Sequence, residues 1–104
     1  MFVHAVYFYL RKDLAPAERQ RFEAGLESLR TIDAARHCWI GVPASTNRPV
    51  IERDYDHALV VVFPDETAHD VYQDHPVHDR FRNECSIYWT KVRIFDSVTE
   101  KQDH

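Results

Sequence analysis

Side-chain character follows the two-residue period of a β-strand along several stretches of the chain. The first runs from Phe2 to Leu10 and the clearest from Tyr55 to Phe63, and both are rich in β-branched and aromatic residues. A third strand is predicted over Tyr88 to Phe95 and a shorter one over residues 36–42. In the first two stretches both alternating sets are largely apolar, so we expect both faces of the sheet to be covered.

One long segment has helical spacing instead. From about Pro16 to Ile32, apolar residues recur three and four positions apart, at Phe22, Leu26 and Leu29. Pro16 suits the first helical turn, because its missing N–H has no partner there.

A second helix is predicted from about Glu66 to Asp74. Asp65 is a good N-cap for it, and Pro76 ends it because the residue before a proline avoids the helical region. A short further helical piece is expected to carry His78, Phe81 and Cys85.

The resulting order is β-α-β-β-α-β, which predicts an α+β, ferredoxin-like fold with a four-stranded antiparallel sheet. Two helices can cover one face of such a sheet, and the other face is apolar as well. Since soluble monomers rarely expose a large apolar surface, we expect a homodimer packed through the sheet face, a dimeric α+β barrel. The domain is predicted over residues 2–97, followed by a short polar tail at 98–104.

Composition and charge narrow the functional classes. The chain has 104 residues, of which 44% are apolar and 29% charged, as expected for one globular domain. Its net charge of −4 and its scattered basic residues argue against nucleic-acid binding. The apolar start is too short for a membrane span and lacks a signal peptide's basic flank. We therefore expect a cytoplasmic protein without membrane association, with Cys38 and Cys85 reduced.

Four short segments together carry a recognisable pattern. They are HAVYF at residues 4–8, YDHALVVVF at 55–63, YQDHPVHDRF at 72–81 and VRIFD at 92–96. The third is the most specific, because a tyrosine is followed by HPxH. From about Phe2 to Ser97 the chain resembles the stress-responsive dimeric A/B barrel (Dabb) family. That family covers plant stress proteins, uncharacterised bacterial proteins and a polyketide cyclase, so the resemblance implies the fold more firmly than an activity.

The resemblance also implies a pocket between the sheet and the helices. In the cyclase a tyrosine and a histidine carry out an aldol condensation, and these catalytic roles fall on Tyr72 and His78. Two further pocket histidines fall on His4 and His57. The implied pocket walls are apolar or aromatic: Phe22, Leu26, Leu59, Phe81, Trp89, Val92 and Ile94.

The chemistry of these residue types fits the implied roles. A neutral imidazole such as that of His78 can remove a proton α to a carbonyl group. A phenol such as that of Tyr72 can donate a hydrogen bond to the enolate that forms. The alternative is structural, with the two side chains hydrogen-bonded to each other. The chain departs from the family pattern at Glu23 and Leu26, where the cyclase has aromatic residues, so the resemblance does not carry the space for a long acyl tail over to this chain.

Metal binding is the other chemistry that the histidines suggest. His75 and His78, with His69 and Asp74 nearby, have side chains that zinc or magnesium binds. Pro76 interrupts the helix between the first two, so their spacing does not bring them together. We expect no metal and no cofactor.

Two functional classes follow for this chain. In both, the expected partners are a second copy of the chain and a small-molecule ligand. The first is a cofactor-free lyase or cyclase acting on a polyketide-like carbonyl compound, or a cofactor-free monooxygenase. The second is a non-catalytic stress-response or small-molecule-binding protein. A pocket of a few hundred Å³ beside His78 favours the first class, and a closed core favours the second.

Overall fold

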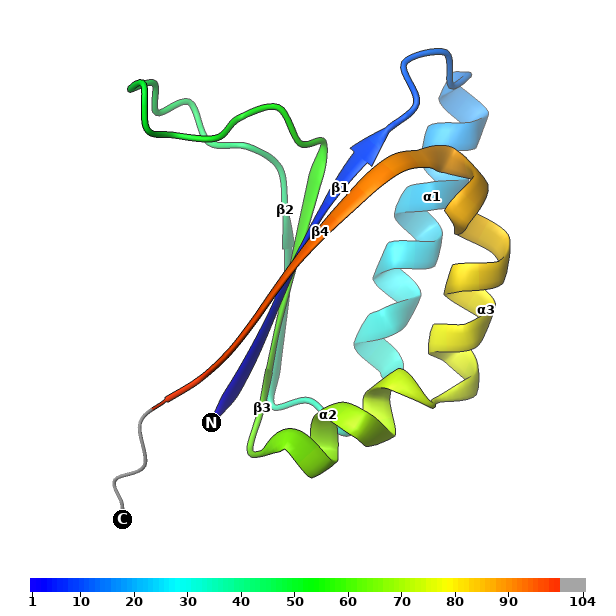
Figure 1. Ribbon diagram of the computed structural model, residues 1–104. Coiled ribbons are helices and arrows are strands. Elements are labelled where there is room, and N and C mark those ends of the chain that lie inside the picture. Colours follow the sequence, from blue (N-terminus) through cyan, green and yellow to red (C-terminus); the bar gives the residue numbers. More distant parts are fainter. Residues whose placement is uncertain (100–104) are drawn as a thin grey trace.

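A four-stranded antiparallel sheet forms one layer of the molecule, and helices form the other (Figure 1). The computed structural model describes residues 1–99. The elements in chain order are β1 (Phe2–Leu10), α1 (Pro16–Ser28), η1 (Leu29–Thr31), β2 (His37–Gly41), β3 (His57–Phe63), α2 (Glu66–Gln73), α3 (Pro76–Cys85), η2 (Ser86–Tyr88) and β4 (Trp89–Val98).

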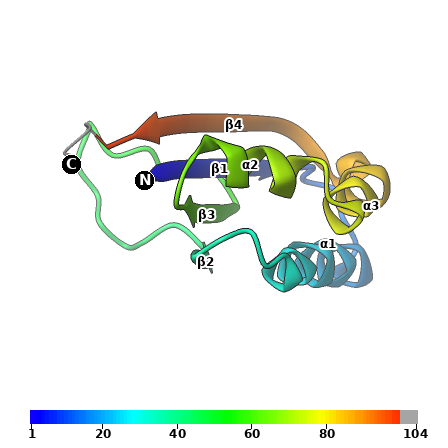
Figure 2. The same cartoon turned by 90° about the horizontal axis from the view of Figure 1, so that it is seen from below.

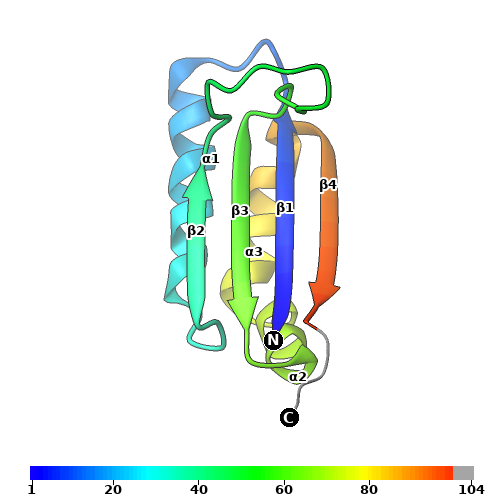
Figure 3. The same ribbon diagram turned by 90° about the vertical axis from the view of Figure 1, so that its left-hand side faces the viewer.

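The strand order β2-β3-β1-β4 confirms the ferredoxin-like fold. β1 lies in the middle and pairs antiparallel with both β3 and β4 (Figure 3). The second helical region consists of two helices, so the order is β-α-β-β-α-α-β. α2 ends before Pro76, which takes the first position of α3, and α2 crosses the end of the sheet where β1 begins (Figures 2 and 3).

Only one face of the sheet is covered by the chain's own helices. Alternate residues of β1 from Phe2 to Leu10 are buried against them, and the intervening residues are half-buried. The apolar stripe predicted for α1 packs on the same side, where Phe22, Leu26 and Leu29 are all buried. The opposite face carries no helix (Figure 3), and large side chains such as Trp39 and Phe95 are more than half exposed there.

The ends of several elements differ from the sequence expectation, most of all at α1 and β4. α1 stops at Ser28 and continues as the 3₁₀ turn η1, so the α-helix does not reach Ile32. β4 extends through Val98, which pairs with Phe2, one residue into the predicted tail. Residues 100–104 of that tail lie outside the described part of the chain.

α1 and α3 approach each other closely at Gly25. A Cβ atom placed there would lie 2.5 Å from the Sγ of Cys85 and 3.3 Å from a ring carbon of Phe81. A hydrogen atom in place of a side chain is therefore what lets the two helices pack together. Within residues 1–99, no helix combines the length and apolar character needed to cross a bilayer.

Candidate functional site

A cavity of about 250 Å³ lies between the helix-covered face of the sheet and α3. It contains two histidines among mostly apolar side chains. The lining residues are His4, Val6, Phe8, Leu29, Leu59, Gln73, His78, Phe81, Arg82, Trp89, Val92 and Ile94.

His78 is placed on this wall by the start of α3. His75 is the N-cap, its Nδ1 accepting a hydrogen bond from the backbone N–H of Val77 at 3.1 Å, and Pro76 opens the helix. His78 therefore falls in the first turn, where it is 8% exposed. Its Nδ1 is buried and has no hydrogen-bond partner within residues 1–99. Desolvation by burial, reinforced by the positive charge of Arg82, lowers the pKa of His78 to about 4, so the imidazole is neutral at pH 7.

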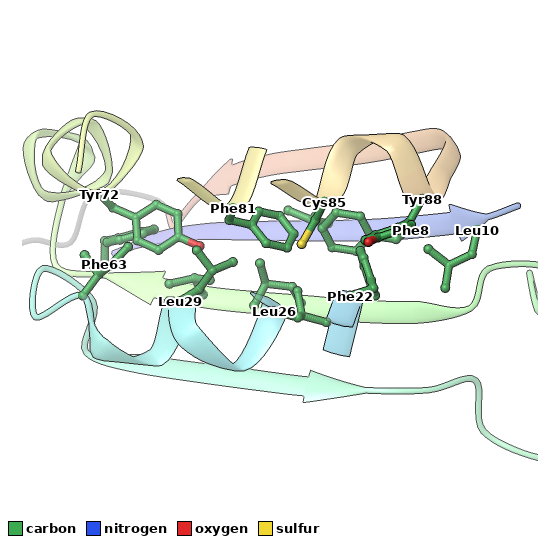
Figure 4. Close-up of a cluster of buried hydrophobic side chains, with 14 of the residues drawn as sticks. Phe8, Leu10, Phe22, Leu26, Leu29, Phe63, Tyr72, Phe81, Cys85 and Tyr88 are labelled. Carbon is green, nitrogen blue, oxygen red and sulfur yellow. The ribbon is translucent and has the colours of Figure 1, made fainter. Parts of the chain in front are cut away.

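Tyr72 lies beside His78, with ring centroids 4.9 Å apart in an edge-on arrangement. It comes from the last turn of α2 and is completely buried. Its hydroxyl has no hydrogen-bond partner and points toward Leu29, a cavity-lining residue (Figure 4). Burial raises the pKa of the phenol, so the group stays protonated and available as a donor. The structural alternative required a hydrogen bond between Tyr72 and His78. These two side chains do not form one.

His4 forms the second polar feature of the cavity, together with Asp96. The register of β1 and β4 sets these residues opposite each other, and His4 Nδ1 lies 2.5 Å from Asp96 Oδ1. A carboxylate only accepts, so Nδ1 carries the proton and Nε2 is left as an acceptor. Burial lowers the pKa of His4 more than the hydrogen bond to Asp96 raises it.

Sequence reasoning missed Asp96 as a site residue, although a signal was present. Val92, Ile94 and Asp96 follow each other at two-residue intervals on one face of β4. An acidic residue that continues an inward-facing apolar series is unusual, and it faces a buried histidine on the neighbouring strand.

The candidate residues named from the sequence divide into two groups. Seven line the cavity: His4, His78, Leu59, Phe81, Trp89, Val92 and Ile94. The other four, which are Tyr72, Phe22, Leu26 and His57, are buried but are not among its lining residues.

His57 is not among the lining residues, and the strand register separates it from His4. It pairs with Phe8, whereas His4 pairs with Val61, so the two histidines are four positions apart along the paired strands, roughly 13 Å. His57 Nε2 lies 3.6 Å from a carboxylate oxygen of Glu23 on α1, the position where this chain departs from the family pattern. Desolvation lowers the pKa of His57, and the Glu23 carboxylate opposes that shift.

Gln73 and Arg82 are polar lining residues that no sequence pattern indicated. The Arg82 guanidinium donates to the Gln73 side-chain oxygen at 3.3 Å and to its backbone carbonyl at 3.1 Å. These bonds tie the end of α2 to α3 beside His78.

Potential metal ligands meet at a different place from the one considered on sequence grounds. Within residues 1–99, ligand atoms of His4, His69 and Asp96 lie within 4.8 Å of one another. His75, by contrast, is used as a helix cap.

A ferredoxin-like sheet with a histidine-lined cavity under its helices defines the class of protein. The chain belongs to the stress-responsive A/B barrel (Dabb) family, whose family model matches residues 2–99. This confirms the resemblance drawn from the four sequence segments. No curated protein matches the sequence.

Solved structures share this fold over nearly the whole chain. A Dabb family protein with a ferredoxin-like fold from Mesorhizobium loti is 25% identical, with 96% of this chain and 97% of that chain covered and a TM-score of 0.76. A dimeric ferredoxin-like protein of unknown function from Thermobifida fusca is 18% identical, covering 94% and 90%, with a TM-score of 0.75. The hydroxynitrile lyase of Passiflora edulis is 16% identical, covering 98% and 96%, with a TM-score of 0.75.

Proposed function

We propose that this protein is a homodimeric enzyme of the lyase or cyclase type, which uses His78 and Tyr72 to abstract a proton next to the carbonyl group of a small molecule. The observation that carries the proposal is the pair of adjacent, buried and unpartnered polar atoms, Tyr72 Oη and His78 Nδ1. Buried polar groups are nearly always paired, and unpaired ones mark places where a ligand or water completes the bonding. Here they occur beside a cavity.

The proposed step uses the two groups in complementary roles. The neutral imidazole of His78 takes the proton α to the carbonyl, and the electron pair of the broken C–H bond forms the enolate. The Tyr72 hydroxyl donates a hydrogen bond to the enolate oxygen. A pKa of about 4 makes the free imidazole a weak base. The enolate formed in the same step is a neighbouring negative charge, which stabilises the imidazolium and raises its pKa in the transition state.

The size of the cavity restricts the substrate. At about 250 Å³ it lies just below the roughly 300–1,000 Å³ typical of ligand pockets. A compact aldehyde or ketone fits this space better than a carbonyl compound with a long acyl tail. The fold that this chain shares with the Passiflora edulis hydroxynitrile lyase supports a lyase that acts on a small molecule.

The homodimer is supported by the uncovered face of the sheet. Phe95 and Trp39 are 54% and 56% exposed on it, and Ala5 and Val60 lie between them in one row across the strands. The similar Thermobifida fusca protein is dimeric. Packing a second copy on this face removes its apolar surface from water and closes the α+β barrel.

Deuterium exchange tests the proposed chemistry without knowledge of the natural substrate. Small aldehydes and ketones are incubated with the protein in D₂O, and loss of the α-proton signal is followed by ¹H NMR. We expect His78→Gln to slow exchange by about 10²–10⁴-fold, the usual contribution of a general base. The matched control is His75→Asn, which removes a nearby imidazole and keeps an N-cap side chain. Equal exchange rates in the two variants would reject His78 as the base.

Binding without turnover is the second candidate, and one observation favours it. Tyr72 is absent from the lining of the cavity, so the hydrogen-bond donor must be reached through a small side-chain movement. A compound that shifts the His78 resonances but shows no exchange above the buffer rate would support this second function.

A further inference from the structure

We propose a second site in this protein, for a divalent transition-metal ion of the Zn²⁺ type, formed by His4, His69 and Asp96. It goes beyond the proposed function and involves neither His78 nor Tyr72. The three residues come from β1, α2 and β4, and they meet at the end of the sheet that α2 crosses (Figures 2 and 3).

The spacing of the three side chains fits a shared ion. Their potential ligand atoms all lie within 4.8 Å of one another. Bonds of about 2.0–2.2 Å to one ion set nitrogen and oxygen ligands roughly 3–4 Å apart, so only small adjustments are needed. The shortest separation, 2.5 Å between His4 Nδ1 and Asp96 Oδ1, must open slightly when the proton between them is replaced by the ion. That proton moves to Nε2 of the same neutral imidazole, which frees the Nδ1 lone pair to bind the ion.

His69 is already held in a suitable way. Its ring stacks on Phe2 with centroids 4.4 Å apart, and it lies 5.1 Å from the ring of His4. Its Nδ1 lies 3.2 Å from a carboxylate oxygen of Asp70. Metal-binding histidines commonly donate their second ring N–H to such a carboxylate, which leaves Nε2 for the ion. Gln73 Nε2 lies 3.3 Å from His69 Nε2, and this side chain must turn aside for the ion to bind.

The donor set selects the kind of ion. Two imidazoles and one carboxylate favour zinc and its first-row neighbours over calcium or magnesium, which prefer oxygen ligands. Three protein ligands leave a coordination position open, as in catalytic zinc sites. His4 also lines the cavity, so the proposed ion site adjoins it.

The experiment uses tag-free, chelator-treated protein and Co²⁺ as a spectroscopic substitute for Zn²⁺. We expect one Co²⁺ per chain, with visible absorption bands that Zn²⁺ removes by competition. His69→Ala should weaken Co²⁺ binding at least tenfold, and so should Asp96→Asn. The His75→Asn control should bind as the wild type does.

Several outcomes would overturn the proposal. They are no visible bands with the wild type, equal weakening in the His75→Asn control, or unchanged affinity in both His69→Ala and Asp96→Asn. His69 is half-buried on the short helix α2, so its variant should fold, and circular dichroism checks this. No substrate is present in these measurements, so failure of the catalytic proposal does not affect their result.

Discussion

Removing the hydroxyl of Tyr72 should stabilise the protein while it removes function. The oxygen is buried in a completely buried side chain and has no hydrogen-bond partner. A buried polar group left unsatisfied costs about 1–3 kcal/mol. Tyr72→Phe removes this cost and loses only the packing of one oxygen atom. We therefore expect the free energy of unfolding to rise by about 1–2 kcal/mol, which corresponds to roughly 4–16 °C in the melting temperature of a domain this size.

Tyr88 provides the matched control, because its hydroxyl, unlike that of Tyr72, has a hydrogen-bond partner. It is also buried, but its hydroxyl accepts a hydrogen bond from Arg21 Nε at 3.0 Å. Tyr88→Phe should lower the free energy of unfolding by about 0.5–1.5 kcal/mol. Both variants are measured by urea unfolding at pH 7 and by thermal melting. If Tyr72→Phe is destabilised as much as Tyr88→Phe, the Tyr72 hydroxyl has a partner in solution and the reasoning is wrong. Stabilisation of Tyr72→Phe together with a lower α-proton exchange rate would show that the unpaired hydroxyl serves function at the expense of stability.

Three further predictions concern pH, helix packing and assembly. The pKa of His78 is lowered from 6.5 to about 4 in the folded state, so the unfolded chain takes up this proton first as pH falls. The contribution of His78 to stability should be complete above pH 6.5 and decline by about 3 kcal/mol toward pH 4. The free energy of unfolding in urea should therefore fall less in His78→Gln than in the wild type over this range, and parallel curves for the two proteins would contradict the prediction. Gly25→Ala should lower the free energy of unfolding by about 1–2 kcal/mol despite alanine's helix propensity, because the added Cβ meets Cys85. The double variant Gly25→Ala/Cys85→Ala should recover part of this loss in thermal melts, and an unaffected single variant would show that the helices separate freely. Phe95→Asp should convert the dimer to a monomer in size-exclusion chromatography with light scattering, whereas Ile87→Asp, at an exposed position outside the sheet, should remain dimeric; a dimeric Phe95→Asp protein would move the interface elsewhere.

Hydrophobic pattern alone was sufficient for the architecture. The alternation in Phe2–Leu10 and Tyr55–Phe63 is a local property, and it correctly predicted two strands with apolar residues on both faces. The spacing of Phe22, Leu26 and Leu29 likewise predicted the buried stripe on the first helix, although not the change to a 3₁₀ turn at Leu29. The pattern underestimates the length of α3, because a proline that ends one helix can also open the next, as Pro76 does.

The tertiary structure decided how the candidate side chains are grouped. The sequence implied one pocket holding His4, His57 and Tyr72, but strand register separates His57 from His4, and packing keeps Tyr72 out of the cavity lining. Register also sets Asp96 against His4, although 92 positions separate them in the chain.

The physical reason is that periodicity fixes only which face of a strand a residue occupies. The residue that faces it on the neighbouring strand depends on the register of the two strands. The α2 side chain that lies over the two paired residues depends on where the helix crosses the sheet. His4 was therefore predictable as an inward-facing histidine from sequence. Its closeness to Asp96 and His69 is a product of long-range packing and could be learned only from the folded chain.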